Sequence, residues 1–200
     1  MVRIYTRTGD DGTTGLLYGG RVRKDDPVME LTGTVDEAQA TIGMARAETD
    51  PGSELDELLT LLERELYVLM AEVATDQRHR AKLVAGTTLV TEGMVEALET
   101  RIDELIGQVE MPPDFVVPGA NRASATLDLA RTVVRRAERL IVAAPIEGSL
   151  VGNYLNRLSD LLWALARWAE GAEHVLARGE PRRTRRTGSP DTGAVAEDPG

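Results

Sequence analysis

Aliphatic side chains recur at every third or fourth position in five stretches of this chain, and this periodicity constrains the fold more than any other feature. Such spacing places the apolar residues on one face of an α-helix, and that face must pack against other helices. The stretches cover approximately residues 27–48, 54–73, 88–108, 121–143 and 150–176. The pattern predicts five amphipathic helices joined by short turns.

Helix-start and helix-stop residues flank these stretches. Asp26 followed by Pro27 is a favoured N-cap with proline in the first turn, and Ser53 with Asp56 three residues later marks a second start. Prolines and a glycine end the third and fourth stretches, at Pro112, Pro113, Pro145 and Gly148. Aromatic residues make up only 4% of the chain, which disfavours a β-sandwich. We therefore predict an all-α fold, a five-helix up-and-down bundle.

The two ends of the chain differ in composition from this helical region. Residues 1–24 combine five glycines with threonine and aspartate, so they predict an extended glycine-rich arm without a helix or a central strand. Residues 178–200 contain almost no apolar side chains and predict a flexible tail. The helical domain then spans residues 25–177. Within the tail, the basic run at residues 182–186 predicts either an anion-binding segment or a solvated charge cluster.

Charge and cysteine content exclude several classes of function. The net charge of −10 would repel a polyanion, so we expect no nucleic-acid partner. The chain has no cysteine, which excludes disulfides and thiolate chemistry and fits a reducing compartment. Its first residues lack the apolar core of a secretory signal, and no stretch of about 18 apolar residues could span a membrane. We therefore expect a cytoplasmic protein without membrane contact.

Metal-binding and nucleotide-binding motifs of the common kinds are absent from the sequence. Two histidines cannot build a histidine cage, and Asp76 with His79 is a single carboxylate–histidine pair, so we expect no metal held by protein side chains. No Walker motif and no strand-borne dinucleotide motif occurs, which excludes a standard P-loop or Rossmann site.

The fourth predicted helix gathers charge on one side. At about 100° per residue, Arg131, Arg135, Glu138 and Arg139 share a face, with Arg136 at its edge. Neighbouring guanidinium groups repel each other unless an anion or a carboxylate lies among them. The face predicts either an anion site suited to a triphosphate or a solvated surface on which Glu138 is the counter-ion.

Two further segments carry polar groups suited to a nucleotide. The fifth predicted helix places Asn153, Asn156, Arg157 and Asp160 on one side, which predicts hydrogen bonds to a base, a ribose or another helix, or else a cap with a surface ion pair. Residues 6–15 of the arm combine small residues with hydroxyl groups, as a loop that wraps phosphates requires, although such a loop can also be a simple turn.

Together these segments resemble the PduO-type corrinoid adenosyltransferases. The matching motifs occur in order along the chain: Tyr-Thr-Arg-Thr-Gly-Asp-Asp-Gly-Thr-Thr-Gly-Leu at 5–16, Arg-Lys-Asp-Asp at 23–26 leading to Gly-Thr-Val-Asp-Glu at 33–37, Phe-Val-Val-Pro-Gly at 115–119, Ala-Arg-Thr-Val-Val-Arg-Arg-Ala-Glu-Arg at 130–139, and Tyr-Leu-Asn-Arg-Leu-Ser-Asp at 154–160.

The resemblance implies a reaction and its partners. The family transfers the 5′-deoxyadenosyl group from ATP to cob(I)alamin, forms adenosylcobalamin and releases triphosphate, with Mg²⁺ bridging phosphate oxygens. It implies a homotrimer with each active site at a subunit interface, and as further partners a flavin reductase and an adenosylcobalamin-dependent mutase. Two alternatives remain: an escort protein that delivers adenosylcobalamin, and a nucleotide-sensing trimer without catalysis.

The resemblance also assigns residues. The arm residues that would wrap ATP are Thr6, Arg7, Thr8, Gly9, Thr14, Gly15 and Lys24. The helix residues that would hold it are Arg135, Glu138, Arg139 and Asn156, with Arg136 adjacent. Asp36 and Arg131 match an intersubunit salt bridge, and Phe115 matches the aromatic residue that closes the lower face of the corrin and favours four-coordinate Co(II). Arg135, Lys24 and Phe115 are the expected catalytic residues.

Overall fold

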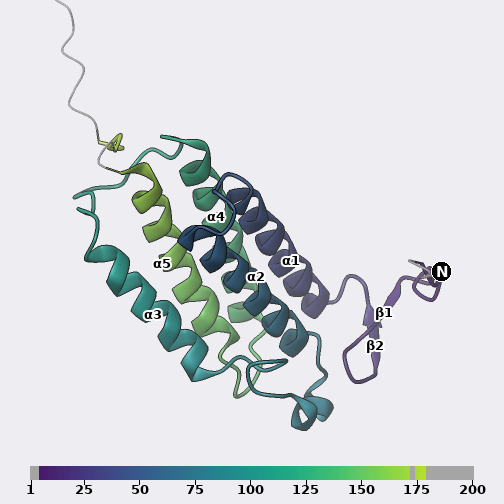
Figure 1. Cartoon of the computed structure of the whole chain (residues 1–200). Helices are drawn as coiled ribbons and strands as arrows, with labels where there is room; N and C mark the ends of the chain where they lie inside the picture. Colours follow the sequence, from purple (N-terminus) through teal and green to yellow (C-terminus); the bar gives the residue numbers. More distant parts are fainter. Residues whose placement is uncertain (1–4, 172–173, 179–200) are drawn as a thin grey trace, which may run out of the picture.

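Helices form most of the part of the chain that the computed structural model describes, residues 5–171 and 174–178. Its five α-helices are α1 (Pro27–Arg46), α2 (Glu54–Val73), α3 (Glu92–Ile106), α4 (Arg122–Ala143) and α5 (Val151–Glu170). Figure 1 shows them lying side by side. The prediction of a mostly helical protein is confirmed.

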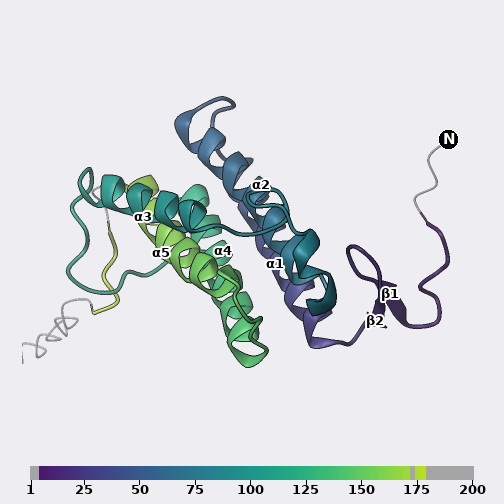
Figure 2. The ribbon, with the colours of Figure 1, turned by 90° about the horizontal axis from the view of Figure 1, so that it is seen from below.

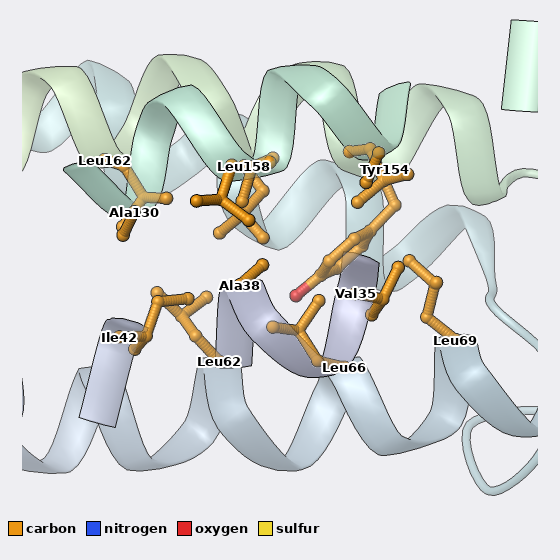
Figure 3. Close-up of a cluster of buried hydrophobic side chains, with 14 of the residues drawn as sticks. Val35, Ala38, Ile42, Leu62, Leu66, Leu69, Ala130, Tyr154, Leu158 and Leu162 are labelled. Atoms are coloured by element: carbon orange, nitrogen blue, oxygen red, sulfur yellow. The ribbon is translucent and has the colours of Figure 1, made fainter. Parts of the chain in front are cut away.

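The core lies where α4 packs between α1 and α5, with α2 against α1 and α3 against α5. Figure 3 shows aliphatic side chains from several helices meeting there, among them Val35, Ala38, Ile42, Leu62, Leu66, Leu158 and Leu162. Burial of each large aliphatic side chain contributes about 1.5–3 kcal/mol. The apolar faces predicted for α4 and α5 are therefore the faces that hold these helices together, and their polar faces are left for other contacts.

Three of the predicted helix starts are confirmed by side-chain caps. The carboxylate of Asp26 accepts from the backbone N–H of Val28, and Ser53 accepts from Asp56. Asn121 caps α4 and forms a reciprocal pair with Ser124. Each cap satisfies a backbone donor that the helix leaves open and contributes about 1 kcal/mol.

Two helices are shorter than predicted. The third helix begins at Glu92, because Thr91 is its N-cap and the preceding Val90 donates its N–H to the buried carboxylate of Glu72. The fifth ends at Glu170, because Gly171 has a φ of 71° that an α-helix cannot contain. Residues 175–177 instead lie along residues 115–117, with Val116 opposite Leu176 in an antiparallel bridge.

The arm contains strands that the prediction of an all-α chain missed. Strands β1 (Thr13–Gly15) and β2 (Arg21–Arg23) pair antiparallel, with Thr14 opposite Val22. Gly19 and Gly20, with φ values of 107° and 97°, allow the chain to turn back between them. Figures 1 and 2 show this hairpin beside the N-terminal end of α1, outside the helices.

The segment between α2 and α3 includes a short 3₁₀-helix, η1 (Gln77–Lys82), capped by Asp76. No helix in residues 5–171 or 174–178 is long and apolar enough to cross a membrane. The predicted tail at residues 178–200 lies outside the described residues except for Arg178, and so do residues 1–4 of the predicted arm.

Candidate active site

The polar face of α4 carries more positive charge than its own carboxylate can balance. Arg135 Nη1 lies 3.8 Å from Glu138 Oε2, and Arg139 Nη1 donates to the backbone carbonyl of Arg135 at 3.0 Å. Within the described chain no carboxylate lies in ion-pair distance of Arg139. Arg136, at the edge of the face, pairs instead with Glu37 of α1. Glu138 is therefore the counter-ion of Arg135, while Arg139 is left without a carboxylate partner in the described residues.

Asn156 of α5 lies directly beside this face. Its amide Nδ2 donates to Glu138 Oε1 at 2.8 Å, and its Oδ1 accepts from Arg157. Arg157 in turn donates to Glu99 of α3 at 2.7 Å. A helix–helix hydrogen bond was one of the predicted roles of the asparagines, and the structure shows it for Asn156. Glu138 thus accepts from Asn156 with Oε1, while its Oε2 lies 3.8 Å from Arg135 Nη1.

In the arm, the predicted phosphate-binding residues Thr6–Gly9 form a turn, while Thr14 and Gly15 lie in β1 and Lys24 directly follows β2. The hydroxyl groups of Thr6 and Thr8 are 2.7 Å apart, and Arg7 has a φ of 64°. A Cβ at Gly9 would lie 3.0 Å from the carbonyl oxygen of Thr13 and 3.3 Å from the ammonium nitrogen of Lys24. The missing side chain at Gly9 therefore lets the Lys24 ammonium approach the backbone of the turn.

The hairpin rests on the segment that follows α2. Leu17 donates its N–H to the carbonyl of Ala74 at 2.8 Å. Glu72, with no exposed surface, fixes this segment because its two oxygens accept from Arg80 and from the N–H of Val90, both at 2.8 Å. Sequence reasoning missed Glu72, although a glutamate within the leucine-rich face of α2 was a signal that could have found it.

The structure does not bring the two halves of the predicted ATP site together. No hydrogen bond or ion pair in the described chain joins residues 5–24 to α4 or α5. Figure 2 shows the hairpin projecting past the end of α1, away from α5. A single chain therefore presents the arm and the arginine face as two separate surfaces.

The predicted pair of Asp36 and Arg131 is not joined within the chain. Arg131 Nε lies 3.3 Å from Asp128 Oδ1 on its own helix. Asp36 is exposed on α1 and has no ion-pair partner in the described residues, and it lines a surface depression with Gln39 and Tyr67. The carboxylate is free to meet a cation from outside the chain.

Phe115 is an exposed aromatic side chain on a fixed backbone. The side chain is 78% exposed, and its neighbour Val117 is 50% exposed. The carbonyl of Phe115 accepts from the N–H of Ala177, and the N–H of Val117 donates to the carbonyl of Val175, both at 2.7 Å. An exposed aromatic ring whose backbone is fixed by a paired segment is suited to cover a large apolar ligand.

Metal-ligating side chains do not cluster in the described residues, where no group of three or more histidines and carboxylates could hold an ion. A divalent cation at this site would depend on oxygen atoms that a nucleotide brings with it.

The sequence also matches known proteins. The family model for cobalamin adenosyltransferase matches residues 4–169. A corrinoid adenosyltransferase of Citrobacter freundii is 42% identical over 180 residues, covering 88% of this chain and all of that protein. The corrinoid adenosyltransferase PduO of Salmonella typhimurium is 38% identical over 175 residues, 86% of this chain and 51% of that protein, so the match spans about half its length.

Solved structures include a similar fold. A variant of the PduO-type ATP:corrinoid adenosyltransferase from Lactobacillus reuteri, complexed with cobalamin and ATP, superposes with a TM-score of 0.77 at 28% identity, covering 88% of this chain and 97% of that one. The family match and the full-length relative show that the chain belongs to the cobalamin adenosyltransferase family.

Proposed function

We propose that this chain transfers the 5′-deoxyadenosyl group of ATP to the cobalt of cob(I)alamin. The Co(I) electron pair attacks C5′ of the ribose, the Co–C bond forms, and the C5′–O bond breaks with its electrons leaving on triphosphate. The main observation behind the proposal is the arginine face of α4, where the arginines have too few carboxylate partners. Asn156 of α5 lies beside this face. The solved relative with bound cobalamin and ATP supports it.

ATP binds between two subunits of a homotrimer, each a five-helix up-and-down bundle with a glycine-rich arm. The arm of one subunit wraps the nucleotide with Thr6, Arg7, Thr8, Gly9, Thr14, Gly15 and Lys24. The helices of the next subunit hold it with Arg135, Arg136, Glu138, Arg139 and Asn156. The separation of these surfaces within one chain supports the arrangement. So do exposed apolar side chains on α1 and α4, namely Met44, Leu129 and Val142.

Lys24 and Arg135 are the catalytic cations. Negative charge grows on the leaving triphosphate as the C5′–O bond breaks, so a positioned cation lowers the barrier more than it strengthens ground-state binding. The attacking electron pair belongs to cobalt, so no protein base is required. Mg²⁺ would arrive with ATP, and its charge would help to stabilise the leaving triphosphate.

The corrin lies against Phe115, whose ring excludes a lower axial ligand and makes Co(II) four-coordinate and easier to reduce. Asp36 of one subunit pairs with Arg131 of another beside this site. A separate flavin reductase supplies the electron, and an adenosylcobalamin-dependent mutase takes the product. The absence of cysteine fits a reducing compartment, and the cytoplasm is where we place the reaction.

The direct test mixes the protein with ATP and chemically reduced cobalamin under strict anaerobiosis. The expected result is the absorbance change of a Co–C bond with one triphosphate released per product. No product under these conditions would reject the transferase.

Arg135→Ala separates the transferase from the escort alternative, and ligand binding separates it from the nucleotide sensor. In this variant synthesis should be lost, because it needs the catalytic arginine. Capture of preformed adenosylcobalamin, the escort activity, should remain. A nucleotide sensor would bind ATP and no corrinoid.

A further inference from the structure

A chain of buried charged side chains connects α4 to the segment that supports Phe115. Arg167 of α5 is among the largest fully buried side chains of the protein, at 1% exposure. The side chains of its two carboxylate partners, Asp128 and Glu170, are 5% and 1% exposed. Nothing in the adenosyl-transfer step requires these groups, and buried charges are costly unless each is paired.

The chain runs in a single order through alternating arginines and carboxylates and ends at the imidazole of His174. Arg131 lies 3.3 Å from Asp128 Oδ1, and Arg167 Nη2 donates to Asp128 Oδ2 at 2.5 Å and to Glu170 Oε1 at 2.8 Å. His174 Nδ1 is 2.9 Å from Glu170 Oε2, and because a carboxylate only accepts, the ring nitrogen is the donor. Each carboxylate bridges two donors, so no oxygen of either one is left to water.

The last member of this chain belongs to the segment paired with Phe115. His174 begins the C-terminal strap, residues 174–178, whose backbone bonds at 2.7 Å hold residues 115–117. The side chain of Phe115 has no packing of its own to fix it, since it is 78% exposed. Its position therefore depends on the strap, and the strap is joined to the helices through His174.

We infer that Arg167 and His174 are positioning residues for Phe115, acting through the strap. The inference rests on the proposed function, in which Phe115 covers the lower face of the corrin. Arg131, at the other end of the chain, is the residue proposed to pair with Asp36 of a neighbouring subunit. The buried charges thus link the subunit contact to the ring that controls cobalt coordination.

His174→Ala is the decisive variant. It removes the side-chain link between the strap and α5 and leaves no buried charge unpaired, because Arg167 still neutralises Glu170. With cob(II)alamin and ATP bound, the four-coordinate fraction measured by electron paramagnetic resonance should fall about threefold or more, while the Kd for ATP stays within about twofold. His174→Gln, whose amide can still donate to Glu170, should recover most of the four-coordinate fraction. Arg101→Met removes an ion pair of 2.8 Å on α3 and is the matched control, with no change expected.

Three outcomes would overturn the inference. One is a wild-type four-coordinate fraction in His174→Ala, and a second is loss of ATP affinity in parallel with that fraction, which is the signature of a general structural role. The third is failure of His174→Gln to restore the fraction. Because wild-type synthesis of adenosylcobalamin is measured first, failure of the proposed function is seen separately. Arg167→Met should give the same spectroscopic change, and His174→Ala decides the question if Arg167→Met does not fold.

Discussion

The arm and the arginine face of α4 are both proposed to bind ATP, but the backbone that holds their side chains differs greatly. The arm is a turn and two strands of three residues, attached to the helices mainly where Leu17 meets Ala74. Arg135 and Arg139 project from a helix whose opposite face is buried in the core. A group on a packed helix is already in place when the substrate arrives, whereas a group on a loop must be ordered at a cost in binding free energy. We therefore expect changes on α4 to lower kcat and changes in the arm, other than at the catalytic Lys24, to raise KM for ATP.

Arg135→Ala gives the largest effect and tests the helix side of this comparison. Removing one preorganised cation from the leaving group should lower kcat by about 10²–10³-fold. The melting temperature should hardly move, because the side chain is about half exposed and its ion pair is long, at 3.8 Å. Steady-state kinetics and a thermal melt measure both.

Arg122→Ala is the control for this prediction, since it makes the same change on the same helix at an 86% exposed side chain. Equal loss of kcat in the two variants would mean that the face has no special role.

Glu72→Gln tests what supports the arm. A glutamine has one acceptor oxygen and an NH₂ group, so either Arg80 or the N–H of Val90 would face a donor. We expect a loss of about 1–3 kcal/mol in the free energy of unfolding, measured in denaturant. The amide of Leu17 should exchange its hydrogen faster, because its acceptor at Ala74 directly follows α2. Unchanged exchange at Leu17 would show that the arm does not depend on this segment.

Gly9→Ala tests the arm side of the comparison. The new Cβ meets the Thr13 carbonyl at 3.0 Å and the Lys24 ammonium at 3.3 Å, so the turn must shift. KM for ATP should rise about tenfold with a smaller change in kcat, the pattern of lost ground-state binding. Gly33→Ala, where a Cβ meets nothing within 4 Å, should behave as wild type. A loss confined to kcat would contradict the distinction between loop and helix.

Glu65→Gln should have the smallest effect. Glu65 lies on α2 and belongs neither to the arm nor to the arginine face of α4. Burial raises the pKa of Glu65 above its ordinary 4.5, against the opposing hydrogen bond from Tyr154. The unfolded chain therefore loses this proton at lower pH than the folded one, and folding stability falls as pH rises above about 4.5. Thermal melts across this range should show the wild type losing stability relative to Glu65→Gln. A constant difference at every pH would contradict the assignment, and kinetics should be unaffected.

The sequence predicted those parts of the fold that depend on residues close together along the chain. Helix starts at Asp26, Ser53 and Asn121 follow from local capping chemistry, and the buried faces follow from the spacing of the leucines. The hairpin was missed because its strands are polar and three residues long, so their pairing is not visible as alternation. Gly171 indicated the early end of α5, but apolar residues continue at helical spacing beyond it and predicted a longer helix.

Buried charges were the other part that the sequence analysis missed. Glu72 and Arg167 belong to residue types that are almost always exposed, and only the partners that folding brings to them make burial possible. For the candidate site, spacing predicted the charged face of α4. In the proposed trimer, that face meets the arm of another chain, so one sequence could show each half and not how they meet.

Mixing two inactive variants tests most directly whether the arm and the arginine face act in different subunits. Lys24→Ala damages the arm, Arg135→Ala damages the helix face, and each alone should be nearly inactive. After denaturation and refolding together in equal amounts, each mixed trimer would contain one intact site, so about a quarter of the wild-type activity should return. Activity no higher than the average of the two separate variants would mean that one chain supplies both halves, and would contradict the shared site.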